Sequence, residues 1–418
     1  MKKTYLKIAF FALMTQFANA QFSLDGEFRP RTEFRHGFGN LIPDDTDAGF
    51  GTSTRVRLNA GYKADEYQFY LSIQDVYTWG ENRQLLPQDV NNSFGVFEAW
   101  VDYKISNNWS TKLGRQTIDY DDERILGSVG WVQQARNHDA ALIKYRKDKF
   151  MLDLAFAFNQ DKADISGFSS VGTDFNTAGF FTYKAMQYAY LKKEWTTFSA
   201  SFLALNTTFQ DLVGGVSAGT TSSLVTTGTH LAYKKDKFGL ESNIFYQTGE
   251  RQNEIKANAY LASLDLSYKA TAKVVLGLGA EIISGQKDDT AAFFPLYGTN
   301  HKFNGLMDYF YVGNHANSIG LVDLHANAKF IFSEKSNLSV SFLNFSGAEA
   351  LPSGEKSLGN EIDLVFATKL KGAGLAIGYS QLFANDGMYE LKGTTKEASS
   401  NLQNWAWVML TIKPKFLN

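Results

Sequence analysis

The sequence predicts an all-β protein: a closed antiparallel transmembrane β-barrel of about 18 strands, with short periplasmic turns and long extracellular loops. Three observations predict this class. The chain opens with an export signal, apolar and polar residues alternate in strand-length segments, and short and long connections alternate between those segments. The 418 residues include no cysteine, which excludes a disulfide scaffold, and the formal charge of −2 offers no basic footprint for nucleic acid.

The first twenty residues have the features of a secretory signal peptide. Three lysines form a positive n-region, residues 8–17 are mostly apolar, and Ala18-Asn19-Ala20 fits a cleavage site. We therefore expect residues 1–20 to be removed, and residues 21–418 to form one domain, the outer-membrane barrel.

The first predicted strand, residues 22–35, has two distinct faces. One face holds Phe22, Leu24, Gly26, Phe28, Pro30, Thr32 and Phe34. The other face holds Ser23, Asp25, Glu27, Arg29, Arg31, Glu33 and Arg35. A period of two residues is that of a β-strand, and this length suits a strand that crosses a bilayer at a tilt. The charged face is expected to look into water and the other face at lipid.

The same alternation recurs along the chain. It is found in residues 52–64, 97–105, 150–159, 238–247, 322–330 and 361–370. A soluble β-sandwich is the alternative, but its strands would be shorter and its outer face would carry the charges. Aromatic residues near the expected strand ends, such as Tyr77 with Trp79 and Trp405 with Trp407, favour the interface girdles of a membrane barrel.

The connections give an independent test of the barrel. Short polar turns are expected at residues 63–65, 106–108, 146–148, 193–194, 234–236, 270–272, 333–336 and 372–373. Longer segments rich in Gly, Asp, Asn and Thr are expected as loops at residues 36–51, 80–92, 119–137, 160–178, 210–221, 251–255, 286–318, 347–358 and 385–402. Turns and loops alternate strictly, which predicts eighteen strands with both termini on the turn side.

The distribution of arginine predicts the character of the lumen, because a barrel of 16–18 strands leaves an aqueous channel. All eleven arginines lie between Arg29 and Arg251, and ten of them precede residue 150. This predicts one wall of positive potential, partly matched by Asp25, Glu27 and Glu33. The planar guanidinium suits the carboxylates of an anionic polymer. The alternative, that each arginine pairs with a neighbouring carboxylate for structural reasons, stays open.

Two regions of the chain carry a family resemblance. The first comprises Leu113-Gly114-Arg115-Gln116, Tyr120-Asp121-Asp122-Glu123-Arg124-Ile125-Leu126-Gly127, Trp131-Val132-Gln133-Gln134-Ala135-Arg136 and His138-Asp139-Ala140. The second comprises Leu296-Tyr297-Gly298, His301-Lys302-Phe303-Asn304-Gly305 and Met307-Asp308-Tyr309-Phe310. Both resemble the alginate-export family of outer-membrane channels, in its Bacteroidetes-type members. The resemblance implies an eighteen-stranded barrel with an arginine-lined conduit for a polyuronate.

The resemblance also implies which residues line the pore. The arginines concerned are Arg29, Arg31, Arg55, Arg57, Arg115, Arg124 and Arg136. The acidic residues expected beside them are Asp25, Glu27, Glu33 and Asp139. Arg115 has the same strand parity as Leu113, so its side chain reaches the lumen only if a β-bulge lies between the two residues.

We therefore expect an outer-membrane channel that passes an anionic polysaccharide or oligosaccharide, such as alginate, and uses no cofactor or metal. The expected partners are this sugar, outer-membrane lipid and the barrel-insertion machinery. Phe416, an aromatic residue near the C-terminus, is typical of barrels that this machinery inserts. No nucleic acid is expected as a partner. Alternatives are a general diffusion porin without polyuronate selectivity, an outer-membrane barrel enzyme and a closed adhesin.

Catalysis and metal binding have weaker support in the sequence. None of the six histidines, His36, His138, His230, His301, His315 and His325, lies in a recognisable nucleophile motif, so no enzyme is predicted. The acidic segments 44–47, 121–123 and 288–289 lack the spacing of a calcium loop, which favours solvated loop charge over a calcium site.

Overall fold

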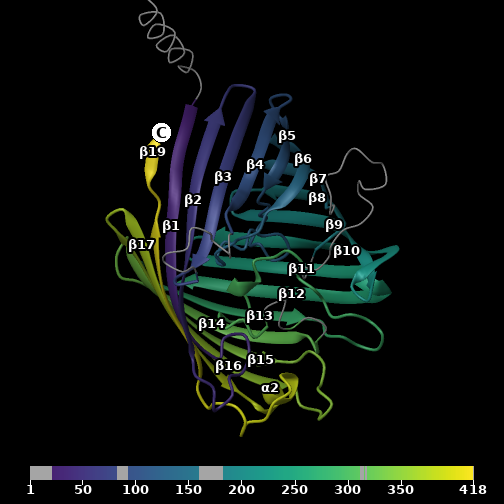
Figure 1. Cartoon of the computed structure of the whole chain (residues 1–418), viewed down its shortest axis with the longest axis vertical. Helices are drawn as coiled ribbons and strands as arrows, with labels where there is room; N and C mark the ends of the chain where they lie inside the picture. Colours follow the sequence, from purple (N-terminus) through teal and green to yellow (C-terminus); the bar gives the residue numbers. More distant parts are fainter. Residues whose placement is uncertain (1–20, 82–92, 160–181, 311–314, 316–317, 418) are drawn as a thin grey trace, which may run out of the picture.

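The computed structural model describes residues 21–81, 93–159, 182–310, 315 and 318–417. The expected signal peptide, Arg83 and the expected loop at 160–178 lie outside these residues. The described residues form one antiparallel sheet that closes on itself (Figure 1). The first strand, β1 (Gln21–His36), pairs with β2 (Gly49–Lys63) along one edge and with β18 (Gln403–Ile412) along the other.

Between these strands the wall is continuous. It is built from β3 (Tyr67–Thr78), β4 (Gly95–Lys104), β5 (Trp109–Gln116), β6 (His138–Lys147), β7 (Phe150–Phe158), β8 (Ala185–Glu194), β9 (Phe198–Val213), β10 (Val216–Lys235), β11 (Phe238–Arg251), β12 (Ile255–Lys269), β13 (Val274–Ile283), β14 (Leu321–Ile331), β15 (Ser336–Ser346), β16 (Ser357–Leu370) and β17 (Ala373–Ala384). A short β19 (Lys415–Leu417) continues β18 past a break and also pairs with β1. The described wall therefore has the predicted eighteen strands.

Helical structure is confined to connections in the described ranges. The 3₁₀ helix η2 (Gln252–Glu254) joins β11 to β12, η3 (Asn300–Lys302) lies between β13 and β14, and the helix α2 (Asp386–Leu391) follows β17. Across the described ranges, no helix is both long and apolar enough to cross a membrane.

The connections follow the expected alternation. Eight short turns, at residues 64–66, 105–108, 148–149, 195–197, 236–237, 270–273, 332–335 and 371–372, overlap or adjoin the predicted ones. Gln21 pairs with Lys63 beside the first of these turns, and the C-terminus lies next to the start of β1 (Figure 1). Both ends of the described barrel therefore lie on the turn side, as predicted.

One expected loop is wrong. Residues 210–221 belong mostly to β9 and β10, which are joined by Gly214 and Gly215 alone. Both glycines have positive φ, 59° and 81°, as a two-residue hairpin turn that matches the strand twist requires. At ~3.3 Å per residue, the 20 residues of β10 extend roughly 66 Å, well beyond a ~30 Å hydrocarbon core.

The two faces of β1 are as predicted, but their environments are not. Phe22, Phe28 and Phe34 are 38–41% exposed on the outward face. On the inward face Arg29 and Arg31 are only 6% and 5% exposed. The charged face was expected to look into water, and instead other parts of the chain cover it from inside the barrel.

Two long connections provide that cover. The first inward loop (residues 117–137, between β5 and β6) and the second inward loop (residues 284–310, after β13) fold into the lumen. They pair with each other through backbone hydrogen bonds, Gly127 N to Tyr297 O at 2.9 Å and Tyr297 N to Ile125 O at 3.0 Å. Leu126 and Leu296 are buried between the loops. The two inward loops therefore cross the lumen toward the end of the barrel where the long connections lie.

Candidate functional site

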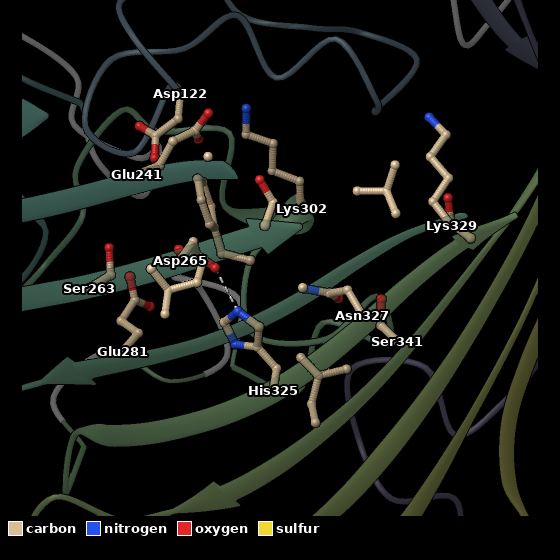
Figure 2. A pocket seen from close by; sticks show the side chains of 18 of the residues that line it. Asp122, Glu241, Ser263, Asp265, Glu281, Lys302, His325, Asn327, Lys329 and Ser341 are labelled. Carbon is tan, nitrogen blue, oxygen red and sulfur yellow. Dashed lines mark hydrogen bonds and ion pairs between the residues drawn. The ribbon is translucent and has the colours of Figure 1, made fainter. Parts of the chain in front are cut away.

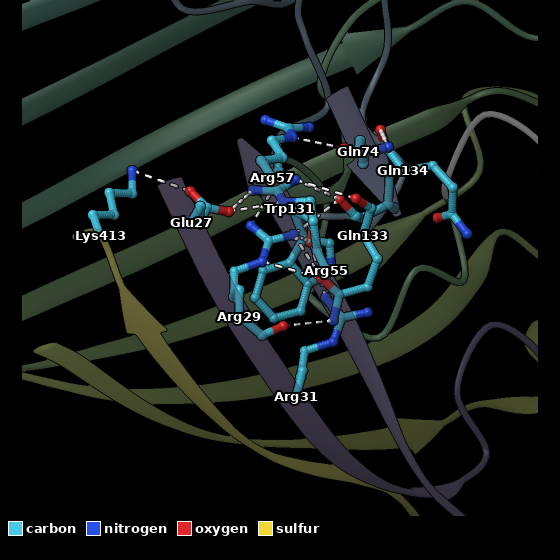
Figure 3. A network of polar contacts seen from close by, with 12 residues as sticks. Glu27, Arg29, Arg31, Arg55, Arg57, Gln74, Trp131, Gln133, Gln134 and Lys413 are labelled. Carbon is cyan, nitrogen blue, oxygen red and sulfur yellow. Dashed lines mark hydrogen bonds and ion pairs between the residues drawn. The ribbon is translucent and has the colours of Figure 1, made fainter. Parts of the chain in front are cut away.

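The arginines of β1 and β2 meet the first inward loop at residues 130–133 (Figure 3). The Arg29 guanidinium donates hydrogen bonds to the carbonyl oxygens of Gly130 (2.7 Å), Trp131 (3.1 Å) and Val132 (3.0 Å) and to Oε1 of Gln133 (3.0 Å). Arg31 donates to the Trp131 carbonyl at 2.9 Å. Arg55 donates to the carbonyls of Val132 and Gln133, at 3.4 and 3.2 Å. Loop carbonyls thus take the places that an anion would occupy on these cations.

Two glutamates neutralise part of the cluster. Glu27 is paired with Arg55 and with Lys413, the latter at 3.3 Å. Glu33 is paired with Arg31 and Arg35, each at 3.0 Å. Such partners are needed because an unpaired buried charge is costly.

Arg29 differs from its neighbours in this respect. Within the described part of the chain it has no ion pair, and all its hydrogen bonds go to neutral oxygens. The side chain is nevertheless almost fully buried. Arg29 is therefore a buried cation whose partners, among the residues described, belong to a loop.

An aromatic cluster holds the same part of the loop. The Trp131 ring lies 4.4 Å from the Arg31 guanidinium carbon and stacks on His301 at 4.5 Å between ring centroids. It also meets Trp407 and Trp405 edge-on, at 4.9 and 5.7 Å. The turn of the loop is thus fixed by ring contacts as well as by the arginines.

Arg57 and Asp25, also predicted to line the pore, lie on the inward face of the same hairpin. Arg57 donates to Gln74 at 2.6 Å, and its guanidinium carbon lies 3.7 Å from the centroid of the Phe97 ring. One terminal nitrogen of Arg57 is buried without a hydrogen-bond partner among the described residues. Asp25 accepts a hydrogen bond from Asn59 at 2.7 Å.

Arg124 and Arg136 tie the two inward loops together. Arg124 is 2% exposed. Two nitrogens of its guanidinium donate to the two carboxylate oxygens of Glu281 on β13, and the Nε bond measures 2.9 Å. The guanidinium also donates to the side-chain oxygens of Asn300, at 2.9 Å, and of Asn304, at 3.1 Å. Arg136 donates to the carbonyl of Gly298 at 3.2 Å. In this structure both arginines hold loops in place; Arg124 is buried and Arg136 is half-buried.

The acidic triplet beside Arg124 contacts three elements, which are β8, β11 and the second inward loop. Asp121 accepts a hydrogen bond from Tyr190 at 2.8 Å, Asp122 accepts one from Asn243 at 2.6 Å, and Glu123 lies 4.0 Å from Lys302. Among the residues described, no group of three or more acidic or histidine side chains is placed to hold a metal ion. The triplet instead fastens the loop to the wall opposite β1.

The second inward loop is fastened through Tyr309. Its hydroxyl donates to the carbonyl of Gly37 and lies 3.1 Å from that of Asn40. Burial raises the pKa of this hydroxyl.

Arg115 and Asp139 were expected to line the pore, and the structure corrects this. They pair with each other on the outward face, where Nε and Nη2 of Arg115 each donate to one carboxylate oxygen of Asp139 at 2.9 Å. The two side chains are 41% and 52% exposed. The outward Leu113 is 50% exposed, and the register of β5 with β4 and β6 runs through Arg115 without a shift. The bulge that would turn Arg115 inward is absent from this pairing, so the two-residue period keeps it outside.

A cavity of about 910 Å³ lies on the turn side of the inward loops (Figure 2). On its wall, His325 of β14 contacts Asp265 of β12 through Nε2 at 2.7 Å and Asp323 through Nδ1 at 3.3 Å. Lys302 and Lys329 also line it. The alternation expected in residues 322–330 places Asp323, His325 and Lys329 on one face of their strand. Asp265 and Lys302 come from other parts of the chain, and this alternation does not predict that they lie beside that face.

A second cavity, of about 530 Å³, lies at the other end of the arginine cluster. Arg31, Glu33 and Arg35 line it together with Gln133 of the first inward loop. The arginine cluster and the inward loops therefore separate a loop-side cavity from a turn-side cavity.

Comparisons with known proteins agree with this architecture. A family described as alginate export matches residues 20–400. The solved structure of OpdK from Pseudomonas aeruginosa is 9% identical with a TM-score of 0.66, covering 95% of this chain and 99% of that one. OccAB4 from Acinetobacter baumannii is 14% identical with a TM-score of 0.63, covering 95% of this chain and 98% of that one. At such identities the likeness shows the fold alone. No curated protein matches the chain in sequence.

Proposed function

The chain belongs to the alginate-export family of outer-membrane channels, and on that premise we propose that its cargo is an anionic polysaccharide or oligosaccharide, such as the polyuronate alginate. The barrel supplies the passage through the outer membrane. The arginines on the inward faces of β1 and β2 supply the contacts to the cargo, namely Arg29, Arg31, Arg55 and Arg57. Glu27 and Glu33 hold Arg55 and Arg31 in position, and Asp25 lies on the same inward face, bonded to Asn59. Arg124 and Arg136 hold the inward loops.

The observation that carries this proposal is the environment of Arg29. Its buried guanidinium is bound by four neutral oxygens of residues 130–133 and by no carboxylate among the described residues. A hydrogen bond between two charged groups is about twice as strong as one between neutral groups. A uronate carboxylate therefore competes favourably with the loop carbonyls, and cargo binding is coupled to movement of residues 130–133.

A general diffusion porin is the second candidate. The pairing of Arg55 with Glu27 and of Arg31 with Glu33 favours it, because these arginines already have carboxylate partners. In that case the positive wall is structural and the channel does not select polyuronates. The family and the similar porin structures favour a channel of either kind over an enzyme.

Substituting Arg29 distinguishes the two candidates. In planar bilayers we expect the native channel to favour anions and its current to be blocked by an oligouronate. Arg29→Gln is expected to raise the basal current, because residues 130–133 lose their anchor, and to weaken the block by roughly tenfold, as for loss of a charged hydrogen bond of ~1.5 kcal/mol.

The matched control is Arg115→Gln, which removes the same charge from the outward face and is expected to leave selectivity and block unchanged. A native channel that favours cations, with a block that Arg29→Gln does not alter, would contradict polyuronate selectivity and support the general porin.

A further inference from the structure

The turn-side cavity is accessible from one face of the membrane. Its lining includes Lys234, Val275 and Lys329, which lie within a few residues of the short turns. Short turns face the periplasm in outer-membrane barrels. Its roof is formed by residues 302–306 of the second inward loop. The cavity is therefore a chamber between the periplasm and the inward loops.

Two lysines in this chamber are available to a ligand, in contrast to the arginines of β1 and β2. Lys329 of β14 is exposed, and its Nζ makes no hydrogen bond or ion pair with any described residue. Lys302 is exposed in the roof; its Nζ forms a long ion pair with Glu123, at 4.0 Å, and lies 5.4 Å from the centroid of the Phe303 ring. Both side chains border the same cavity (Figure 2).

Neutral polar groups lie next to these lysines. Asn327 and Ser341 are cross-strand partners on β14 and β15, and both line the chamber. Neither side chain forms a hydrogen bond with the described residues. The facing residue on β13 is Gly277, and the Asn327 side chain lies against it, 3.3 Å from where a Cβ atom would be. The amide and hydroxyl are therefore free to bind sugar hydroxyls.

The roof also provides an aromatic surface. Phe303 is half-buried and lines the chamber beside Lys302. The guanidinium carbon of Arg124 lies 4.4 Å from the Phe303 ring centroid and supports the ring. An aromatic ring held in this way can stack against the apolar face of a pyranose.

Most acidic side chains of the chamber have partners of their own. Glu281 pairs with Arg124, and Asp363 accepts hydrogen bonds from Ser380 and from the backbone N–H of Leu306. Asp265 and Asp323 both contact His325, one at each ring nitrogen. A histidine that donates from both nitrogens is an imidazolium, so it offsets part of this negative charge. Glu241 and Asp122 lie toward the opposite end of the chamber from Lys329 (Figure 2). Lys329 therefore lies away from these two carboxylates, whereas Lys302 lies beside them (Figure 2).

We propose that this chamber is a binding subsite for a uronate or short oligouronate that enters from the turn side. Lys302 and Lys329 bind the carboxylate, Asn327 and Ser341 bind ring hydroxyls, and Phe303 packs against the sugar ring. The volume of about 910 Å³ falls within the ~300–1,000 Å³ of small-molecule pockets, enough for more than one sugar unit. This inference rests on the proposed function, and it assigns the first contact with the cargo to lysines and not to the arginine cluster.

The test is the double variant Lys302→Gln with Lys329→Gln. The matched control is Lys335→Gln with Lys371→Gln, which removes the same charge from exposed turns on the same side of the barrel. Binding of a mannuronate trimer, and of neutral maltotriose, to the full detergent-solubilised protein is measured by titration calorimetry. We expect the trimer to bind the native protein and to bind the control with the same affinity. The chamber variant is expected to bind the trimer about tenfold more weakly, because it loses two exposed ion pairs of up to ~1 kcal/mol each. Maltotriose is expected not to bind.

The outcomes separate the two proposals. If the native protein binds the trimer and the chamber variant binds it equally well, the chamber assignment is overturned while the proposed function stands. If the control loses as much affinity as the chamber variant, the effect is one of overall charge and the assignment is also overturned. If the native protein neither binds the trimer nor is blocked by it in bilayers, the proposed function itself fails.

Discussion

Gly279 lets a histidine reach across a strand. Its lumen-side position on β13 lies between Asp265 on β12 and His325 on β14. A Cβ atom at this position would lie 2.1 Å from Nε2 of His325 and 2.4 Å from Oδ1 of Asp265, closer than atoms can approach. The contact between His325 and Asp265 therefore depends on the absence of a side chain at residue 279.

Gly279→Ala is expected to destabilise the barrel, because the added methyl group forces His325 away from Asp265. The cost expected for such overpacking is about 1–3 kcal/mol. Thermal unfolding in detergent, followed by circular dichroism, measures it.

Gly277→Ala is the matched control on the same face of the same strand. Its Cβ would lie 3.3 Å from the Asn327 side chain, a contact that a small movement of that side chain relieves. Equal stability of the two variants would show that the contact between His325 and Asp265 does not contribute to the stability of the barrel.

The first inward loop shows, at the scale of an element, how hydrogen bonds from the wall position a connection. Gln133 is buried, accepts hydrogen bonds from Arg29 and donates to the carbonyl of Ser53 at 3.1 Å. The neighbouring Gln134 is exposed, and Figure 3 shows its side chain directed away from the arginines. Two adjacent glutamines thus differ in whether they hold the loop.

Gln133→Ala is expected to loosen the loop and raise the open-channel current, because it removes the side-chain partner of Arg29 and leaves donors of a buried cation unsatisfied. A loss of about 1–3 kcal/mol is expected for such a buried group. Single-channel recording measures the current, and Gln134→Ala is the control. A current that does not differ between the two variants would contradict a loop held by Arg29.

The hairpin of β9 and β10 shows why one element was mistaken for a loop. Its outer part is rich in Thr, Ser and Gly, which resembles loop composition. In the structure these residues form cross-strand hydrogen bonds, Ser222 to Asp211 at 2.6 Å and Thr208 with Ser223 at 3.2 Å. This part of the hairpin extends past the hydrocarbon core, so no lipid contact requires an apolar outward face there.

At the scale of the whole molecule, the outward surface is what assigns the barrel to a membrane. Large apolar side chains on several strands are exposed there, including Ile244 at 53%, Leu278 at 64% and Leu324 at 52%. Contiguous apolar surface of this kind is not stable in water. Lipid is therefore the solvent of this face, in agreement with the outer-membrane location of the family.

The absence of cysteine from the sequence allows this assignment to be tested with single thiols. In isolated outer membranes, Leu278→Cys is expected not to react with a membrane-impermeant maleimide, because lipid covers it. Asn327→Cys, which is exposed in the turn-side chamber, is expected to react. Equal labelling of both thiols would place residue 278 in water and would contradict the orientation of β13.

The sequence by itself determined the class of fold, the number of strands and the face on which most residues lie. The alternation of Phe28 with Arg29 is a local property, since adjacent side chains on a strand point to opposite faces. The same rule indicated the outward position of Arg115, and the expectation that it lines the pore came from the resemblance.

Only the tertiary structure decided what each inward side chain meets. Arg29 and Gln133 are 104 residues apart in the chain, and Arg124 and Glu281 are 157 apart. Whether an inward arginine faces water or the backbone of a folded-in loop depends on such distant contacts, and a period of two residues carries no information about them. Lys302 and Lys329 likewise line one chamber only because the second inward loop folds back over the wall.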